Sequence, residues 1–341
     1  MERVMDMKTC VGKKLETVFA MALICSMLLC GNASAVSLVA LDLAEIVDQT
    51  APSVVEVFTE TKQVSGWFQE YVTEGAGSGV VLTEDGYIVT NRHVIDGAGT
   101  VKVRLNNGQT YPAAVTGKDA KTDLAVLKIE AEGLTAAKLA DSSQARVGDF
   151  VIAIGNPLGE LGGTVTEGIV SALGREITID GQAMTLLQTS AAVNPGNSGG
   201  GLFNLEGELV GVVSAKSSGS GIEGLAFAIP SNTVGEIAGE LMENGYVTGR
   251  PRLGVSAARL TRPGQSMYFD QPGVYIAQVA EENGLKAGDR ILQIDGTAIQ
   301  STTDISTVLD RHSAGDTVKV ELVRSGKHTT VHVVLTEKGP E

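Results

Sequence analysis

The residues best suited to chemistry in this sequence are a serine, a histidine and an aspartate that stand far apart along the chain. A serine hydroxyl is a weak nucleophile until a neighbouring base accepts its proton, and histidine serves well as that base near neutral pH. The chain has four histidines, and three of them, His312, His328 and His332, lie close to its end. If Ser198 is a nucleophile in the larger N-terminal part, its base is therefore His93.

Both partners of Ser198 stand next to predicted strands. His93 follows the strand-like run Tyr87–Thr90, and Asp123 directly precedes the apolar run Leu124–Ile129. Strand ends are where a rigid scaffold presents reactive groups. A half-buried carboxylate at such a place can hold one imidazole tautomer. Taken singly, either residue is more readily explained by a structural hydrogen bond or a turn cap, so the prediction depends on their combination.

The segment around Ser198 reads Asn-Pro-Gly-Asn-Ser-Gly-Gly over residues 194–200. Glycines beside a serine let the backbone turn sharply and bring amide groups towards a substrate carbonyl. We predict an oxyanion hole made by the amides of Gly196 and Ser198, with Asn197 held between them. A plain Gly-rich loop is the alternative, and the position of this segment after a histidine and an aspartate at strand ends disfavours it.

Short apolar runs separated by turn residues extend from Val54 to Ile229. Ser78–Leu82 and Tyr87–Thr90 flank Glu84-Asp85-Gly86, which is a strong hairpin signal. Runs of this length and spacing predict a β-barrel or a β-sandwich. Further strands are predicted at Val101–Leu105, Leu124–Ile129, Phe150–Ile154, Leu209–Ser214 and Leu225–Ile229.

The pattern changes to a helical period after these strands. Thr233–Glu236 resembles a capping box, and Asn244-Gly245 is a typical helix end. Residues 246–251, with Gly249 and Pro251, predict a short linker. The apolar positions at helical spacing are Val234, Ile237, Ala238, Leu241 and Met242.

The chain after the linker predicts a compact α+β domain. One helix is expected near Thr303–Arg311, and strands at Val274–Val279, Arg290–Ile294, Val318–Val323 and Thr329–Leu335. His328 and His332 have a spacing that could suit two metal ligands, but their run is strand-like and offers no third ligand. A solvated strand face is the preferred interpretation, and no metal site is predicted.

The N-terminal segment reads as a secretory signal. Lys13 and Lys14 precede the thirteen-residue apolar run Val18–Cys30, and small residues stand at Ala33 and Ala35. This order predicts a signal peptide over residues 1–35, cleaved after Ala35. A bilayer span takes about 20 apolar residues, so the run is short for an anchor, and an uncleaved inner-membrane anchor stays open as the alternative.

All three cysteines, Cys10, Cys25 and Cys30, lie inside this segment. The mature chain would therefore have no disulfide, no thiolate metal site and no cysteine nucleophile.

Charge separates two further parts of the chain. Residues 36–249 hold 11 basic and 26 acidic groups, whereas residues 250–341 hold 11 of each. This break supports a domain boundary near residue 250. The net charge of −14 argues against nucleic acid as a partner, since phosphate binding needs clustered positive charge.

The runs TNRHVI, TDLAVLKI and NPGNSGG, in this order, resemble the HtrA (Deg) family of trypsin-like serine proteases. The resemblance implies a mostly β fold, with a trypsin-like double β-barrel over residues 36–245. It places His93, Asp123 and Ser198 at the family's catalytic triad and implies no cofactor. Asn197 stands where digestive relatives carry an aspartate, so activation by an ion pair with a new N-terminus is not expected.

The resemblance also suggests residues for specificity and control. Val193 and the small residues Ser217 and Gly219 suggest a shallow apolar pocket for a small aliphatic side chain before the cleaved bond. Arg175 matches a family arginine that relays signals from the neighbouring domain, although a solvated surface arginine explains it equally well. Ser190, Gly201 and Arg92 depart from the usual family residues without removing a catalytic group.

Residues 252–338 resemble a PDZ domain of the bacterial permuted type, on the runs RLGV and GLKAGDRILQIDG. Such a domain adds an extended peptide to a sheet edge, and loop amides capture the terminal carboxylate. Leu253, Gly254 and Val255 match that loop. The usual Ser-Pro-Ala before Gly-Leu is replaced by Glu281-Glu282-Asn283, which puts the shape of the groove in doubt.

Together these features predict an ATP-independent endopeptidase of exported-protein quality control, in the periplasm or outside the cell. Its expected partners are unfolded proteins, C-terminal peptides at the PDZ domain and, by resemblance, two further copies in a homotrimer. Two rivals stay open: a chaperone or peptide-sensing scaffold, and a narrow signalling protease that cuts one membrane-linked partner.

Overall fold

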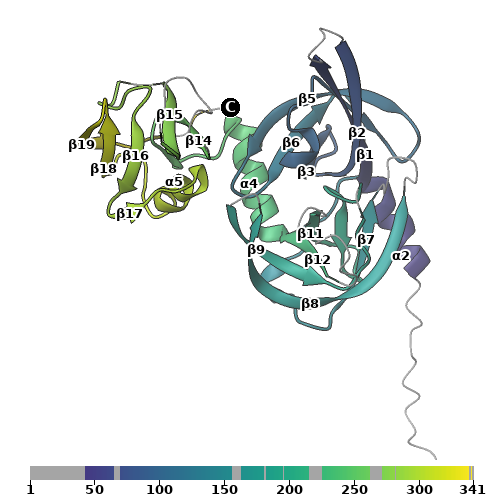
Figure 1. Cartoon of the computed structure of the whole chain (residues 1–341). Coiled ribbons are helices and arrows are strands. Elements are labelled where there is room, and N and C mark those ends of the chain that lie inside the picture. Colours follow the sequence, from purple (N-terminus) through teal and green to yellow (C-terminus); the bar gives the residue numbers. More distant parts are fainter. Residues whose placement is uncertain are drawn as a thin grey trace, which may run out of the picture. The chain divides into compact units, whose positions relative to one another are not determined.

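The computed structural model describes residues 43–341 except 65–69, 156–162, 180–181, 195, 215–224, 262–270, 281, 338 and 340–341. The predicted signal segment therefore lies outside the described residues. The chain enters through helix α2 (Leu43–Thr50) and a 3-10 turn at Ala51–Ser53. Two closed β-barrels follow, then helix α4 and a smaller C-terminal domain (Figure 1). No helix in the described part of the chain is both long and apolar enough to span a bilayer.

The first barrel has six antiparallel strands in the order β1-β2-β3-β6-β5-β4, and pairing of β1 with β4 closes it. The predicted hairpin is confirmed, because β2 pairs with β3 across the turn at residues 83–86. The short helix α3 (Arg92–Ile95) follows β3 directly. The strands are β1 (Val54–Val64), β2 (Glu70–Val81), β3 (Tyr87–Asn91), β4 (Thr100–Arg104), β5 (Thr110–Asp119) and β6 (Leu124–Ile129).

The second barrel repeats this plan in the order β10-β11-β12-β9-β8-β7, closed by pairing of β10 with β7. The long strands β8 and β9 were not predicted, since glycines and polar residues interrupt their apolar pattern. The strands are β7 (Phe150–Gly155), β8 (Thr164–Ile179), β9 (Gln182–Thr189), β10 (Gly201–Phe203), β11 (Leu209–Ser214) and β12 (Ala226–Pro230).

Strand β6 is apolar at every position except Lys128. Leu124 and Val126 belong to a core that also includes residues of the second barrel and of α4, whereas Ala125, Leu127 and Ile129 belong to the core of the first barrel. Side chains alternate between the two faces of a strand, so a strand covered on both faces carries few polar positions. The shared core fixes the two barrels against each other, and this arrangement positions the candidate site.

Helix α4 (Ser231–Asn244) closes the barrel part. Four of its apolar positions are fully or nearly fully buried in the shared core, and Gly245 ends it in the left-handed region at φ 80°. The predicted capping box at Thr233–Glu236 is wrong. The N-cap is Pro230, three residues before Thr233, and the first turn is held by side chains that bond to another segment: Ser231 donates to the Ala140 carbonyl at 2.7 Å.

The C-terminal domain is an antiparallel sheet in the order β14-β15-β16-β18-β19, with one helix packed on its core. Helix α5 (Thr302–Leu309) begins with a true capping box between Ser301 and Asp304. The other elements are β13 (Pro251–Arg252), β14 (Val255–Leu260), β15 (Gly273–Val279), β16 (Arg290–Ile294), β17 (Thr297–Ala298), β18 (Thr317–Arg324), β19 (Lys327–Val334) and β20 (Thr336–Glu337).

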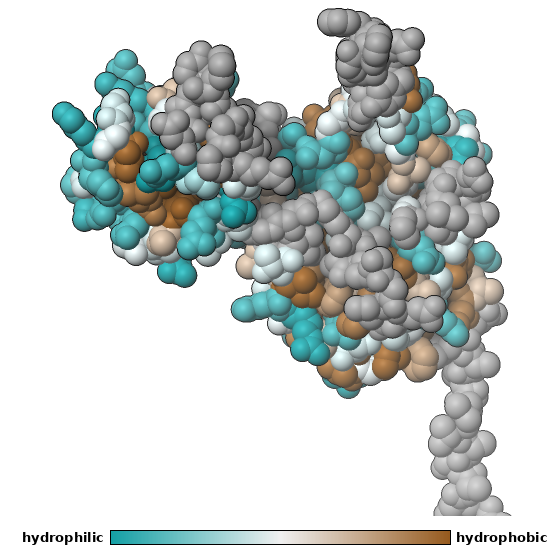
Figure 2. All heavy atoms as spheres, viewed as in Figure 1, coloured by the Kyte–Doolittle hydropathy of each residue, from teal (hydrophilic) through white to brown (hydrophobic). Residues whose placement is uncertain are grey.

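Hydrophobic residues also reach the surface. Figure 2 shows them as brown areas between hydrophilic residues on the barrels and on the C-terminal domain. Val147 and Phe150 keep 62% and 58% of their surface exposed. Apolar exposure of this kind is common on folded proteins, and we assign it no role.

Candidate active site

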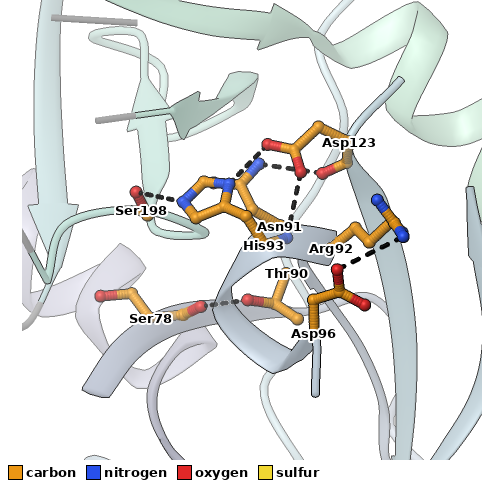
Figure 3. Close-up of polar contacts among 8 residues, drawn as sticks. All are labelled: Ser78, Thr90, Asn91, Arg92, His93, Asp96, Asp123 and Ser198. Carbon is orange, nitrogen blue, oxygen red and sulfur yellow. Dashed lines mark hydrogen bonds and ion pairs between the residues drawn. The ribbon is translucent and has the colours of Figure 1, made fainter. Parts of the chain in front are cut away.

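The structure brings His93, Asp123 and Ser198 together (Figure 3). The Nδ1 atom of His93 lies 2.6 Å from Oδ2 of Asp123, and its Nε2 atom lies 3.0 Å from Oγ of Ser198. An ionised carboxylate only accepts hydrogen bonds, so the neutral ring carries its proton on Nδ1. Its Nε2 then has a lone pair directed at the serine hydroxyl, which is the arrangement that general-base catalysis requires.

Asp123 is held in an unusual backbone conformation by the segment that carries His93. Its φ is 56°, in the left-handed region that few residues other than glycine adopt. Its carbonyl accepts from the amide of Arg92 at 2.8 Å and from Nδ2 of Asn91 at 3.2 Å, while its Oδ1 accepts from the amide of His93 at 3.0 Å. These bonds hold the strained turn and aim the carboxylate at the imidazole.

Asn91 is therefore part of the site although the sequence analysis did not single it out. Its side chain is fully buried, and it clamps the backbone of Asp123 rather than contacting the imidazole. Its position in the sequence, two residues before His93 at the end of a strand, was the one indication of a role in the site. An asparagine at that position does not by itself predict a hydrogen bond to Asp123, 32 residues later.

Ser198 lies in a tight turn between β9 and β10 of the second barrel. Its side chain is 6% exposed, and Gly199 follows with φ 85°. A Cβ atom at Gly199 would lie 2.1 Å from the carbonyl oxygen of Ser78, so only glycine fits there. The amide of Gly199 donates to the Val213 carbonyl at 2.9 Å, which ties the serine loop to β11.

Gly196 and Asn197, the other residues of the predicted oxyanion hole, adjoin Ser198 in this turn. Gly196 adopts φ 101°, and the amide of Asn197 donates to the Asn194 carbonyl at 3.0 Å. The Asn197 amide is thus engaged within the loop. Its side chain is also buried, and Oδ1 has no hydrogen-bond partner in the described part of the chain.

Of the three predicted pocket residues, the structure describes Val193. Val193 packs against a core cluster of the second barrel, whose members are Val151, Ala153, Val170, Ala191, Leu202, Val213 and Ala228. Ser217 and Gly219 lie outside the described residues. Ser190, which departs from the family pattern, accepts a hydrogen bond from the Ile169 amide at 3.1 Å, so its hydroxyl anchors the loop to β8.

Arg175 lies on β8, opposite Leu186 of β9, and its Nε donates to Oε1 of Gln188 at 3.1 Å. Its side chain is thus held against β9, the strand that precedes the serine loop. His328 and His332 lie exposed on β19, as the strand interpretation expects. No cluster of three or more metal-ligand side chains occurs among the described residues.

In the C-terminal domain, Leu253 is buried and Gly254 adopts φ 67° just before β14 begins at Val255. The Gly254 carbonyl accepts from the Ala280 amide at 2.9 Å, and the Leu253 carbonyl accepts from Nδ2 of Asn283 at 2.7 Å. Asn283, one of the departures from the family pattern, therefore holds this loop. Strand β14 is at the end of the sheet order.

Comparison with known proteins decides the family. Residues 77–212 match the trypsin-like peptidase domain and residues 251–335 match the PDZ domain. The chain is 40% identical over 327 residues to the serine protease Do-like HtrB of Bacillus subtilis, covering 87% of this chain and 71% of that protein. The chain belongs to the HtrA family of serine proteases.

Other members of the HtrA family agree. The periplasmic serine endoprotease DegP of Salmonella typhimurium is 42% identical over 271 residues, covering 76% of this chain and 57% of that protein. Among solved structures, the HtrA-type protease AlgW with decapeptide has a TM-score of 0.59 at 33% identity, covering 87% of this chain and 99% of that chain. The serine endoprotease from Yersinia pestis has a TM-score of 0.56 at 34% identity, covering 86% and 97%. The chain is a serine endopeptidase with a double-barrel protease fold and one PDZ domain.

Proposed function

We propose that Ser198, His93 and Asp123 perform the peptide-bond cleavage of this HtrA protease. The observation that carries the proposal is the continuous chain of contacts from the Asp123 carboxylate through the His93 ring to the Ser198 hydroxyl, at 2.6 and 3.0 Å. At this distance the Ser198 proton can pass to His93 Nε2 while the serine oxygen forms its bond to the substrate carbon.

The cleavage proceeds in two acyl transfers. Ser198 Oγ attacks the substrate carbonyl carbon while its proton passes to Nε2 of His93. The tetrahedral intermediate collapses, the C–N bond breaks, and the leaving amine takes the proton from Nε2. Water then attacks the acyl-enzyme ester, giving its proton to His93, and the Ser198 oxygen leaves with that proton. Asp123 stabilises the imidazolium in both halves.

We further propose that the amides of Gly196 and Ser198 bind the oxyanion. The positive φ of Gly196 and the engaged amide of Asn197 support this assignment, because they leave the amides on either side of Asn197 as the candidates. Such donors typically contribute about 3 kcal/mol each to transition-state stabilisation.

For the PDZ domain, we propose that C-terminal peptides bind along β14 beside Leu253, Gly254 and Val255, and that this binding regulates cleavage. The positive φ of Gly254 turns the loop into the start of an edge strand, which is the geometry for adding a peptide strand. The decapeptide complex of AlgW supports this for a relative.

We place the protein in quality control of exported proteins, with unfolded or damaged chains as substrates. The signal-like N-terminal segment and the periplasmic names of several relatives support export to the periplasm or beyond. The family resemblance adds a homotrimer, which sedimentation of the purified chain would measure directly.

One experiment tests the site and its control together. The purified chain is labelled with a fluorophosphonate probe and assayed for casein degradation, with and without a C-terminal peptide. We expect labelling and degradation in the wild type, stimulation by the peptide, and neither activity in Ser198→Ala. An amidated peptide, which lacks the terminal carboxylate, should not stimulate. Ser231→Ala removes a buried serine hydroxyl in α4 and is expected to keep both activities.

The outcomes separate the rivals. Equal casein turnover by Ser198→Ala would remove Ser198 from the mechanism. Binding of unfolded casein without cleavage by the wild type, at any peptide concentration, would favour a chaperone or scaffold. Cleavage of one membrane-linked protein but not of casein would favour a signalling protease.

A further inference from the structure

Ser78 connects the first barrel to the serine loop. It lies on β2, its side chain is fully buried, and its Oγ donates to the carbonyl of Gly196 at 2.8 Å across 118 residues of sequence. Glycines stand on both sides of it. A Cβ atom at Gly77 would lie 2.6 Å from a methyl group of Val94, and one at Gly79 would lie 2.8 Å from a methyl group of Ile88, so this stretch of β2 is tightly enclosed.

The backbone of Ser78 is fixed by two more hydrogen bonds. Its amide donates to the carbonyl of Ser198 at 2.8 Å, and its carbonyl accepts from Oγ1 of Thr90 at 2.6 Å. Figure 3 shows the contact between Ser78 and Thr90 below the His93 segment. Ser78 therefore bonds to the carbonyls of the two residues whose amides are the proposed oxyanion donors.

This geometry controls the orientation of the Gly196 amide. The peptide unit between Gly196 and Asn197 is held at both ends, because its oxygen accepts from Ser78 and its N–H donates to the Asn194 carbonyl at 3.0 Å. Gly196 is free of the steric limits that a side chain would impose, so these bonds must supply the restraint. The Gly196 N–H belongs to the preceding peptide unit, so holding the Gly196–Asn197 unit restrains one of the two backbone rotations that set its direction.

The enclosure of the Ser78 hydroxyl supports a specific role. Gly155, at the end of β7 in the second barrel, could not carry a Cβ, since that atom would lie 3.0 Å from Oγ of Ser78 and 2.8 Å from Oδ1 of Asn197. The hydroxyl is thus packed between the two barrels beside the loop. A hydroxyl has one proton to donate, and the Gly196 carbonyl receives it.

We infer that Ser78 is a positioning residue for transition-state stabilisation: its hydroxyl holds the Gly196 carbonyl, which restrains Gly196 in the conformation that directs its own N–H at the oxyanion. The inference rests on the proposed roles of Ser198, Gly196 and His93. Removing the hydroxyl leaves the part-buried Gly196 carbonyl without this donor and gives the glycine more freedom to rotate. Substrate binding through other contacts is expected to continue, while the negative oxygen of the tetrahedral intermediate loses support.

The test compares Ser78→Ala with Ser231→Ala. The two serines are matched, because each is fully buried and donates its hydroxyl to a backbone carbonyl, at 2.8 and 2.7 Å. Both variants lose one buried hydrogen bond, so both should lower Tm similarly. With a fluorogenic peptide we expect Ser78→Ala to lower kcat about 10- to 100-fold with KM within about twofold, less than the loss of an oxyanion donor itself. Ser231→Ala should keep kcat.

A second readout isolates the oxyanion. A peptide boronic acid forms a tetrahedral adduct with the nucleophilic serine and places an oxygen in the oxyanion hole, whereas the cleaved product peptide does not. Ser78→Ala should weaken boronate affinity by about the same factor as kcat and leave product affinity unchanged. A structural role alone would weaken both equally, and that result would overturn the inference.

Three further outcomes are decisive. If Ser78→Ala keeps kcat within twofold of Ser231→Ala while Ser198→Ala is inactive, the inference fails and the proposed site stands. If Ser198→Ala stays active, the proposed site itself fails. If Ser78→Ala does not fold, Thr90→Val removes one of the bonds that place Ser78. That variant should lower kcat about three- to tenfold, and an unchanged kcat would count against Ser78.

Discussion

The barrels and the PDZ domain present their functional groups in different ways. In the barrels, the reactive side chains come from segments 30 and 105 residues apart in the sequence, and hydrogen bonds from other elements hold them. In the PDZ domain, Leu253, Gly254 and Val255 are consecutive, and the loop offers backbone groups at the start of an edge strand. The proposed side-chain chemistry thus depends on long-range folding, whereas the proposed peptide capture depends on the local course of the backbone.

The two regions also allow buried neutral groups to be compared with a buried charge. Near Ser198, the side chains of Ser78, Thr90 and Asn91 are buried and neutral, and they bond to backbone carbonyls. In the PDZ domain, Asp289 is 1% exposed and forms two hydrogen bonds with the Arg324 guanidinium, at 2.8 and 2.6 Å. A buried charge depends on its partner much more than a buried hydroxyl does. Each of the following predictions tests one side of this comparison.

The largest effect is expected from Asp123→Asn. The substitution keeps the size of the side chain but removes the acceptor that holds the His93 Nδ1 proton, so the ring is free to adopt the tautomer that cannot accept from Ser198. We expect kcat on a fluorogenic peptide to fall about 10⁴-fold, as for the corresponding change in other Ser-His-Asp enzymes. Calorimetry should show unchanged binding of a C-terminal peptide.

A loss of less than about tenfold would show that Asp123 is not needed to orient His93. A loss of peptide binding in the same variant would show that peptide binding by the PDZ domain is not independent of the barrel site.

An intermediate effect is expected from Asp289→Asn in the PDZ domain. The substitution leaves Arg324 without its carboxylate, and pairing with that carboxylate now raises the pKa of Arg324. Breaking a buried ion pair from one side typically costs 3–5 kcal/mol, and we expect about 3 kcal/mol here because Arg324 keeps some solvent contact. Urea titration followed by circular dichroism should show the loss, while cleavage of a short peptide persists below the transition.

The matched control is Glu321→Gln, which removes a carboxylate from the exposed pair between Glu321 and Lys319 in the same sheet. Exposed pairs contribute less than about 1 kcal/mol, so this variant should unfold near the wild-type midpoint. Equal destabilisation by the two variants would contradict the distinction between a buried and an exposed charge.

The smallest effect concerns two helix-terminal carboxylates, one in each region. Asp141 in the barrel part accepts hydrogen bonds from Asn232 and Ser143, which lower its pKa from 3.8 to about 2. Hydrogen bonds from the amides of Gln300 and Ser301 likewise lower the pKa of Asp304 in the PDZ domain. A carboxylate with a lowered pKa stabilises the fold above its unfolded pKa, and the contribution is lost as pH falls through the folded value.

We therefore expect Asp141→Asn to lower Tm modestly at pH 5–7, with a difference from wild type that shrinks from pH 4 towards pH 2. Asp304→Asn should show the same sign in the transition of the PDZ domain. Differential scanning calorimetry across this pH range measures both. A difference that grows as pH falls would contradict the assigned role of either carboxylate.

Much of the fold was predictable because its signals are local. The runs Leu124–Ile129 and Leu209–Ser214 are strands with the predicted bounds, and the hairpin around Glu84-Asp85-Gly86 forms as expected. Strand β8 was not predicted because Gly168 and Gly174 interrupt its apolar pattern. The strand forms nevertheless, and it pairs with β7 on one side and β9 on the other. The start of α4 was misplaced because its first turn is held by Ala140, which no local pattern could indicate.

The sequence by itself determined the residue types for the chemistry and the order of the elements that carry them. The proposed nucleophile, base and carboxylate could be predicted because few histidines were available and each group stands beside a strand or a glycine turn. The tertiary structure alone decided which neutral groups hold them, namely Asn91, Thr90 and Ser78. These side chains bond to backbone carbonyls contributed by other elements of the chain, and a hydrogen bond of that kind depends on how the barrels close rather than on any local preference of the chain.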